Sequence, residues 1–158
     1  MSVKRLKFLP AVTLIEVMVA IIILSVGVLG AAGYRYYCAL DARKADEHIT
    51  AARLGLLLLE SWNGVNASTD YDPVAEFGSE LAIEPIYEVP EIPLAGFGLL
   101  GVYRITIGSV NYDAMLLWQD VSDGLRAISV IVVWGRDTDI SDFWNSSKSF
   151  RLTTYTST

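Results

Sequence analysis

The sequence contains one cysteine, Cys38, and one histidine, His48. A lone cysteine cannot form a disulfide within the chain, which excludes the disulfide frameworks of small secreted domains. A nucleophile triad needs a histidine beside an activated nucleophile, and nothing in the sequence marks a serine as activated. We expect His48, which lies among charged residues, on a solvated helix face. The sequence therefore predicts no enzyme, and we expect no cofactor.

Basic residues are also few, with 12 Lys and Arg against 18 Asp and Glu and a formal net charge of −6. Nonspecific binding of nucleic acid depends on a positive field that neutralises phosphates. The chain has no such global field, so nucleic acid is not an expected ligand.

Charge is absent from Val17 to Gly33, and the wider apolar run 12–33 is interrupted by Glu16, Thr13 and Ser25 alone. A helix needs roughly 20 residues to cross a bilayer, so we predict that 12–33 spans a membrane. The basic residues that precede the run keep the N-terminus in the cytoplasm, and they are Lys4, Arg5 and Lys7. We expect a single pass through the inner membrane, with the remaining chain in the periplasm.

Proline and turn clusters are absent between Val12 and Trp62, which predicts one helix of about 51 residues that stops at Asn63-Gly64. The second half of this helix, 34–63, is amphipathic. Leucines between 54 and 59 make its last turns apolar on nearly all sides, so we expect a sheet to cover them. Steps of three and four residues define one apolar helix face, made of Ala42, Ala45, Ile49, Ala52, Leu56 and Leu59.

The region 64–102 holds four of the five prolines, which favours a long irregular connection with one short strand near Ile86 to Val89. From 103 to 158 the apolar period changes to two, as half-buried strands require. The expected strands of this antiparallel sheet are 103–107, Ala114–Trp118, Ala127–Trp134 and Phe150–Tyr155. The predicted fold class is α+β, a long N-terminal helix packed on a small antiparallel sheet.

One sequence motif follows the basic segment and opens the apolar run: Ala11-Val12-Thr13-Leu14-Ile15-Glu16-Val17-Met18-Val19-Ala20. It resembles the class III leader of the type IV prepilins and pseudopilins. The resemblance implies that a prepilin peptidase removes a leader, 1–11, by cutting between Ala11 and Val12, and then methylates the new amine of Val12. The family usually has glycine before the cut and phenylalanine or methionine after it, and this chain departs from both.

Glu16 is the chemically informative residue of this string. An unpaired carboxylate costs on the order of 2.5–3.5 kcal/mol at the centre of a bilayer, so one retained near its edge requires a partner. The resemblance implies that this partner is the Val12 amine of a neighbouring subunit, with Thr13, Leu14 and Ile15 completing the assembly motif. A pair of charges in hydrocarbon also sets the register between two helices.

Further candidates lie outside this motif. Gly27, Gly30 and Gly33 recur at three-residue steps, which suits close helix packing or local unwinding. Three acids in a polar stretch before the last strand are weak candidates for a calcium site, and they are Asp137, Asp139 and Asp142.

The segments Ile21–Gly30 and Val132–Trp134 look most like the minor pilins, which initiate or modify type IV pili. The resemblance implies a membrane-anchored structural subunit that is processed and then assembles into, or primes, a pilus filament. Its partners would be the prepilin peptidase, other pilin or pseudopilin subunits and the inner-membrane assembly platform.

Four alternatives stay open. A minor pseudopilin of a type II secretion system belongs to the same class. A membrane-anchored periplasmic binding domain that never polymerises belongs to a different one. The N-terminal segment alone also fits a plain signal anchor with an incidental acid, or a secretory signal peptide cut near Gly30-Ala31-Ala32.

Overall fold

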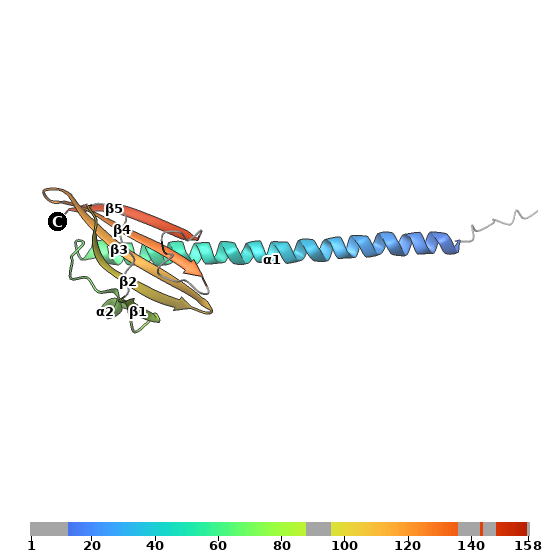
Figure 1. Ribbon diagram of the computed structural model, residues 1–158, viewed down its shortest axis with the longest axis horizontal. Helices are drawn as coiled ribbons and strands as arrows, with labels where there is room; N and C mark the ends of the chain where they lie inside the picture. The colour runs from blue at the N-terminus through green and yellow to red at the C-terminus, as the bar shows by residue number, and fades with distance from the viewer. Residues whose placement is uncertain (1–12, 88–95, 136–142, 144–147, 158) are drawn as a thin grey trace, which may run out of the picture. The chain divides into compact units, whose positions relative to one another are not determined.

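The computed structural model describes residues 13–87, 96–135, 143 and 148–157, which form an α+β fold (Figure 1). The chain divides into two compact units, Met1–Lys44 and Ala45–Thr158, and helix α1 contributes to both. The elements are α1 (Leu14–Gly64), α2 (Pro73–Phe77), β1 (Ile83–Ile86), β2 (Gly98–Ile107), β3 (Val110–Ser122), β4 (Leu125–Gly135) and β5 (Ser149–Ser157). The predicted fold class is confirmed.

Helix α1 has 51 residues and ends at Gly64, which confirms the predicted stop. Beyond it the backbone turns through two residues with positive φ, Asn66 at 54° and Ala67 at 50°. The amide of Ala67 donates to the carbonyl of Trp62 over 3.1 Å, and the indole Nε1 of Trp62 donates to the carbonyl of Ser68 over 2.8 Å. The first bond satisfies a carbonyl that the helix end leaves unpaired, and the second satisfies the indole of the buried Trp62.

The five strands form one antiparallel sheet in the order β1-β2-β3-β4-β5. All four predicted strands are present, and each is longer than predicted. The expected irregular connection, 64–102, also contains α2 and the start of β2, and the short strand expected near Ile86 to Val89 lies earlier, as β1. Pro85 obscured β1. That strand lies at the sheet edge, where a residue without an amide hydrogen is tolerated.

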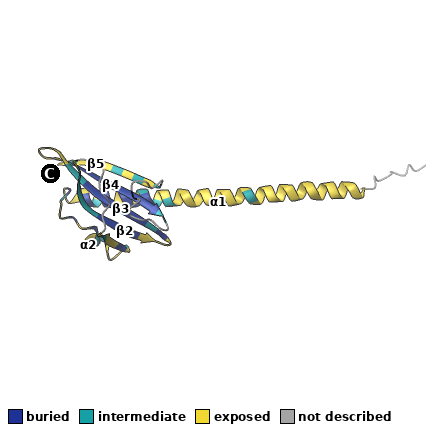
Figure 2. Ribbon diagram, viewed as in Figure 1, coloured by how far each residue is buried: buried dark blue, intermediate teal, exposed yellow. Residues whose placement is uncertain are grey.

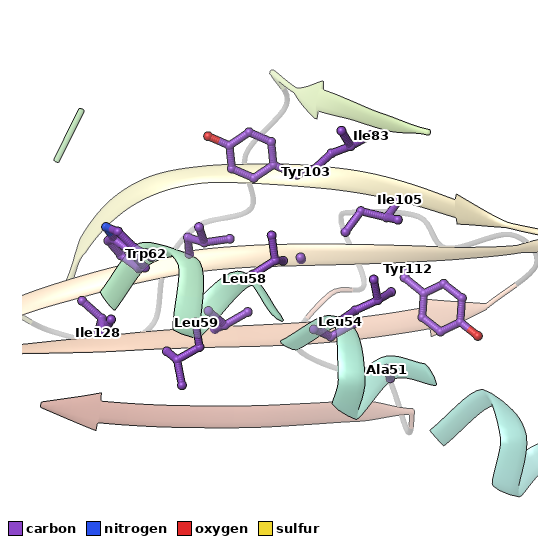
Figure 3. Close-up of a cluster of buried hydrophobic side chains, with 14 of the residues drawn as sticks. Ala51, Leu54, Leu58, Leu59, Trp62, Ile83, Tyr103, Ile105, Tyr112 and Ile128 are labelled. Carbon is purple, nitrogen blue, oxygen red and sulfur yellow. The ribbon is translucent and has the colours of Figure 1, made fainter. Parts of the chain in front are cut away.

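The last three turns of α1 cover one face of the sheet (Figure 3). The apolar side chains of β2, β3 and β4 that meet them include Tyr103, Ile105, Leu116, Ile128 and Val130. Burying each large side chain contributes roughly 1.5–3 kcal/mol, so this contact dominates the stability of the domain. The residues of α1 that are buried here are Ala51, Leu54, Gly55, Leu58, Leu59 and Trp62.

The apolar helix face predicted from the sequence differs from this buried face. Leu59 belongs to both, whereas Ile49 and Leu56 remain 50% and 47% exposed. The expectation that the leucines from 54 to 59 would all be covered is also wrong in part, because Leu57 is 39% exposed as well as Leu56. A helix on a flat sheet buries one stripe, and the remaining apolar residues stay outside it.

The opposite face of the sheet is also apolar, and it includes the buried side chain of Phe143. Asp113 lies in this layer at 1% exposure and accepts two hydrogen bonds from the Arg104 guanidinium, over 2.8 and 2.9 Å. A bidentate pair of this kind compensates the burial of a carboxylate. The remaining buried residues of this layer are Val102, Met115, Leu117, Ile131 and Val133.

Gly55 sits where α1 approaches strands β4 and β5. A Cβ added there would lie 3.4 Å from Leu152 Cδ1 and 3.5 Å from Val132 Cγ2, which is ordinary van der Waals contact. We therefore expect Gly55→Ala to raise the free energy of unfolding by about 0.5–1 kcal/mol, because alanine stabilises a helix relative to glycine. Gly55→Leu should instead lower it by about 1–3 kcal/mol through overpacking. Urea unfolding of the full chain in detergent measures both, and destabilisation by alanine would contradict this packing.

Buried tyrosines predict that the domain loses stability in alkali. Burial raises the pKa of Tyr103 to about 12, and the nearby charge of Asp72 adds to the effect. Burial also raises the pKa of Tyr71 and of Tyr112. An unfolded tyrosine loses its proton near pH 10, so between pH 10 and about 12 the unfolded chain binds fewer protons than the folded one.

The free energy of unfolding should therefore not depend on the titration of Tyr103 below pH 10. It should fall as the pH rises toward 12. Tyr103→Phe should make this alkaline loss less steep. Urea unfolding monitored by circular dichroism across this range gives the slope for both proteins. An equal slope in the two would show that Tyr103 titrates normally in the folded chain.

Candidate membrane anchor and assembly site

The N-terminal part of α1 exposes its apolar side chains. Figure 2 shows this in yellow, and from Leu14 to Ala32 every residue is exposed. Among the helices in the described part of the chain, α1 is the one long and apolar enough to cross a membrane. The segment from Leu14 to Gly33 is about 30 Å long at 1.5 Å per residue, which matches the hydrocarbon thickness of a bilayer.

Glu16 lies in the first turn of this helix. Thr13 precedes the helix, and its carbonyl accepts hydrogen bonds from the amides of Glu16 and Val17, over 3.0 and 3.3 Å. A carboxylate at this position is favoured by the positive end of the helix dipole. Thr13 and Glu16 also have the spacing of a capping box, yet among the described residues the Glu16 carboxylate makes no hydrogen bond or ion pair.

The second polar side chain of the span behaves differently. The Ser25 hydroxyl donates to the carbonyl of Ile21 over 2.7 Å, so the helix itself satisfies it. A hydroxyl bonded in this way needs no outside partner in lipid. Within Leu14–Gly33, Glu16 is therefore the side chain whose polar atoms still require one.

A shallow open groove runs along the helix beside this carboxylate. It is lined by Glu16, Val17, Ala20, Ile21 and Leu24, which share one helix face at steps of three and four. Glu16 supplies its one charge, and the other lining side chains are apolar. Such a groove can receive an apolar side chain of a second helix while a cation meets the carboxylate.

The three glycines predicted for packing or unwinding lie within the uninterrupted helix. A Cβ added at Gly27, Gly30 or Gly33 would meet nothing within 4 Å, so packing within the chain does not require glycine at these positions. The helix is continuous at these positions. Close packing against another helix, or unwinding as the subunit enters a filament, stays a prediction for these glycines.

Other predicted residues have simpler surroundings. Cys38 is exposed. His48 is also exposed, but its ring packs edge-on against the ring of Trp134 with centroids 4.7 Å apart, so its face is only partly solvated. No group of three or more metal-binding side chains occurs among the described residues. The remaining predicted residues lie outside them, namely Ala11, Val12, Asp137, Asp139 and Asp142.

Sequence reasoning gave no role to a group of tyrosines just beyond the apolar segment. Tyr34, Tyr36 and Tyr37 are all exposed, and Arg35 stands among them. Tyrosine is enriched where membrane meets water, because its ring is apolar and its hydroxyl is polar. The signal was available in the sequence as three aromatic residues directly after Gly33.

Comparisons with known proteins do not assign the chain to a family. No family model, curated protein or solved structure matches it. The geometry of the described residues is therefore the basis for assigning a function.

The exposed Cys38 allows a direct test of topology in spheroplasts. If the segment before it spans the membrane with its N-terminus inside, a membrane-impermeant maleimide added to spheroplasts should label Cys38. In a matched variant, Cys38→Ser with Leu14→Cys, labelling should require permeabilised membranes. Labelling of the second variant in intact spheroplasts would contradict this orientation.

Proposed function

We propose that this chain is a pilin-like structural subunit, anchored in the inner membrane by α1 and assembled into, or priming, a type IV pilus filament. The observation that supports this most directly is the carboxylate of Glu16. It is the single charge between Leu14 and Gly33, and it has no partner among the described residues. Lipid offers such a group no hydrogen bonds, whereas a second subunit can supply a cation.

The proposed partner of Glu16 is the amine of Val12 in a neighbouring subunit, freed when a prepilin peptidase cuts after Ala11. An ion pair at the edge of the hydrocarbon is strong because the local dielectric is low. It also fixes register, since any other alignment of the two helices leaves both charges unpaired. Delivery into the filament would take place at an inner-membrane assembly platform.

The two parts of α1 have different surroundings, which also supports the proposal of a filament subunit. In the unit Ala45–Thr158, the helix residues from 51 to 62 are the ones that cover the sheet. The apolar residues before Gly33 are exposed and contribute nothing to that core. Their apolar surface therefore suits an external environment, which is lipid before assembly and neighbouring helices after it.

Glu16→Gln separates this proposal from a local role in capping the helix. Glutamine keeps the capping-box pattern but removes the charge. We expect Glu16→Gln to insert and be processed normally, while its incorporation into filaments falls roughly tenfold or more, as for Glu16→Val, because a lost ion pair of at least about 1.4 kcal/mol gives that factor. Immunoblotting of sheared filaments against whole cells measures incorporation.

Mass spectrometry of the same samples checks processing. The mature chain should begin at Val12 and carry an N-methyl group in both the wild type and Glu16→Gln. Normal incorporation of Glu16→Gln would show that assembly does not need the charge of Glu16, and a native chain that begins at Met1 or beyond Gly33 would end the proposal.

A further inference from the structure

The two edges of the sheet differ in how they are protected. An edge strand carries unpaired amide and carbonyl groups, and proteins commonly protect it with proline, with bulges or by keeping the strand short. Strand β1 has four residues and contains Pro85. Strand β5 has nine residues, contains neither proline nor glycine, and pairs with β4 in an unbroken register (Figure 1). Among the described residues no strand pairs with its outer side, which we call the open edge.

The hydrogen bonds between β4 and β5 decide which backbone groups face the open edge. The amide of Trp134 donates to the carbonyl of Lys148 over 3.3 Å. Every second residue of an antiparallel pair bonds to its neighbour in this way, so the residues of β5 with even numbers bond to β4. The residues whose amides and carbonyls face outward are therefore Ser149, Arg151, Thr153, Tyr155 and Ser157.

Exposed apolar side chains of α1 lie beside the open edge. Gly55 sits above the edge of the sheet, because a Cβ added there would lie 3.4 Å from Leu152 Cδ1 on β5. The residues before and after it point to opposite sides of that position. Leu54 is buried and so lies toward the middle of the sheet, whereas Leu56 is 47% exposed and lies toward the open edge. Ala52, one turn earlier, is half-buried on the same side of the helix as Leu56.

The other face of β5 carries the single charge of this strand, Arg151. Its Nε donates to the Ser129 hydroxyl over 3.1 Å, and its Cζ lies 5.8 Å from the centre of the Phe97 ring. In the described part of the chain no carboxylate pairs with it. A second copy of β5 contains no acid to offer, and β1 of a second copy is too short to pair with most of β5. Neither edge of another copy therefore complements the open edge.

We propose that the open edge binds an extended segment of a different protein, which joins the five-stranded sheet as a further strand beyond β5. The backbone of this segment bonds to the outward amides and carbonyls of β5. On the α1 side its side chains are apolar, because they meet Leu56, Ala52 and Leu152. On the other side they are polar, with an acidic residue beside Arg151. This inference concerns the unit Ala45–Thr158 and rests neither on Glu16 nor on filament assembly.

Hydrogen exchange measured by NMR on the full-length chain in detergent micelles tests the open edge before any partner is added. The amides of Arg151, Thr153 and Tyr155 should exchange roughly tenfold or more faster than those of Leu152 and Thr154, because only the second set bonds to β4. Equal protection of both sets in dilute protein would show that the edge is already covered and would overturn the proposal. Protection of the first set that grows with protein concentration would assign the edge to a second copy, and would equally overturn the proposed partner.

A synthetic peptide of the length of β5 serves as the probe for the partner strand. Its sequence, Thr-Ile-Glu-Ile-Thr-Ile-Glu-Ile-Thr, places isoleucine on one face and a glutamate beside Arg151 in either strand direction. At saturation it should slow exchange of the outward amides of Arg151, Thr153 and Tyr155 roughly tenfold or more. A peptide of the same composition with its isoleucines at the two ends, Ile-Ile-Thr-Glu-Thr-Glu-Thr-Ile-Ile, should have no effect. The proposal fails if the first peptide leaves these amides unchanged, or if both peptides protect them equally.

Variants locate the binding surface, and fluorescence anisotropy of the labelled peptide measures its affinity. Leu56→Glu should weaken binding roughly tenfold or more, because it places a charge against the apolar face of the peptide. Leu57→Glu is the matched control, since this neighbour is also exposed but points about 100° further round the helix, away from the open edge. Equal affinities of the two variants would show that α1 takes no part in the site.

Two further variants test the backbone and the charge. Thr153→Pro removes an outward amide that β4 does not use, so the chain should fold and bind the peptide roughly tenfold or more weakly. Arg151→Gln should weaken binding of the glutamate peptide but not of the same peptide with glutamine in its place. Circular dichroism checks folding, and if Thr153→Pro does not fold, the comparison of Leu56→Glu with Leu57→Glu still decides the outcome. Unchanged affinity of a folded Thr153→Pro would rule out strand addition at this edge.

Discussion

The contact between the last three turns of α1 and the sheet is the interaction on which the domain depends. Trp62 and Leu58 are fully buried there, among side chains from β2, β3 and β4. A sheet of this size cannot leave an apolar face in water, and a helix this apolar cannot remain stable in water alone. Because residues 51–62 supply the helix side of this core, the segment of α1 before Gly33 takes no part in it. Its apolar residues are then available to lipid and to other chains.

The parts of the fold that could be predicted were those with a local signal. A stretch without proline from Val12 to Trp62 predicted the helix, and alternation at Tyr103, Ile105 and Ile107 predicted a strand. Strand β1 was misplaced because its Pro85 reads as a loop signal unless the strand is known to lie at an edge. The burial of Asp113 was not predictable, since its partner Arg104 is set by the pairing of β2 with β3.

The candidate site divides in the same way. A single acid in an apolar run is visible in any sequence, so Glu16 could be selected from the residues alone. What it binds was not readable, because the chain holds no partner for it among the described residues. The apolar face of α1 predicted from Ala42 to Leu59 shows the reverse case. Its periodicity is visible in the sequence, but Ala51, Leu54 and Gly55 cover the sheet in place of most of it, which depends on how the helix is rotated on the sheet.

The energetics of Glu16 explain why such a residue suits assembly under the proposed function. The helix dipole stabilises a carboxylate in the first turn by about 0.3–1 kcal/mol, and snorkelling toward the headgroups reduces its desolvation further. Together these effects lower the cost of the unpaired charge in a lone subunit. They offset only part of the penalty that the charge meets deeper in hydrocarbon, which reaches about 2.5–3.5 kcal/mol at the bilayer centre. A cation supplied by a neighbouring helix offsets the rest of this penalty. The same carboxylate that is tolerated in a single subunit therefore favours association of that subunit with a neighbour.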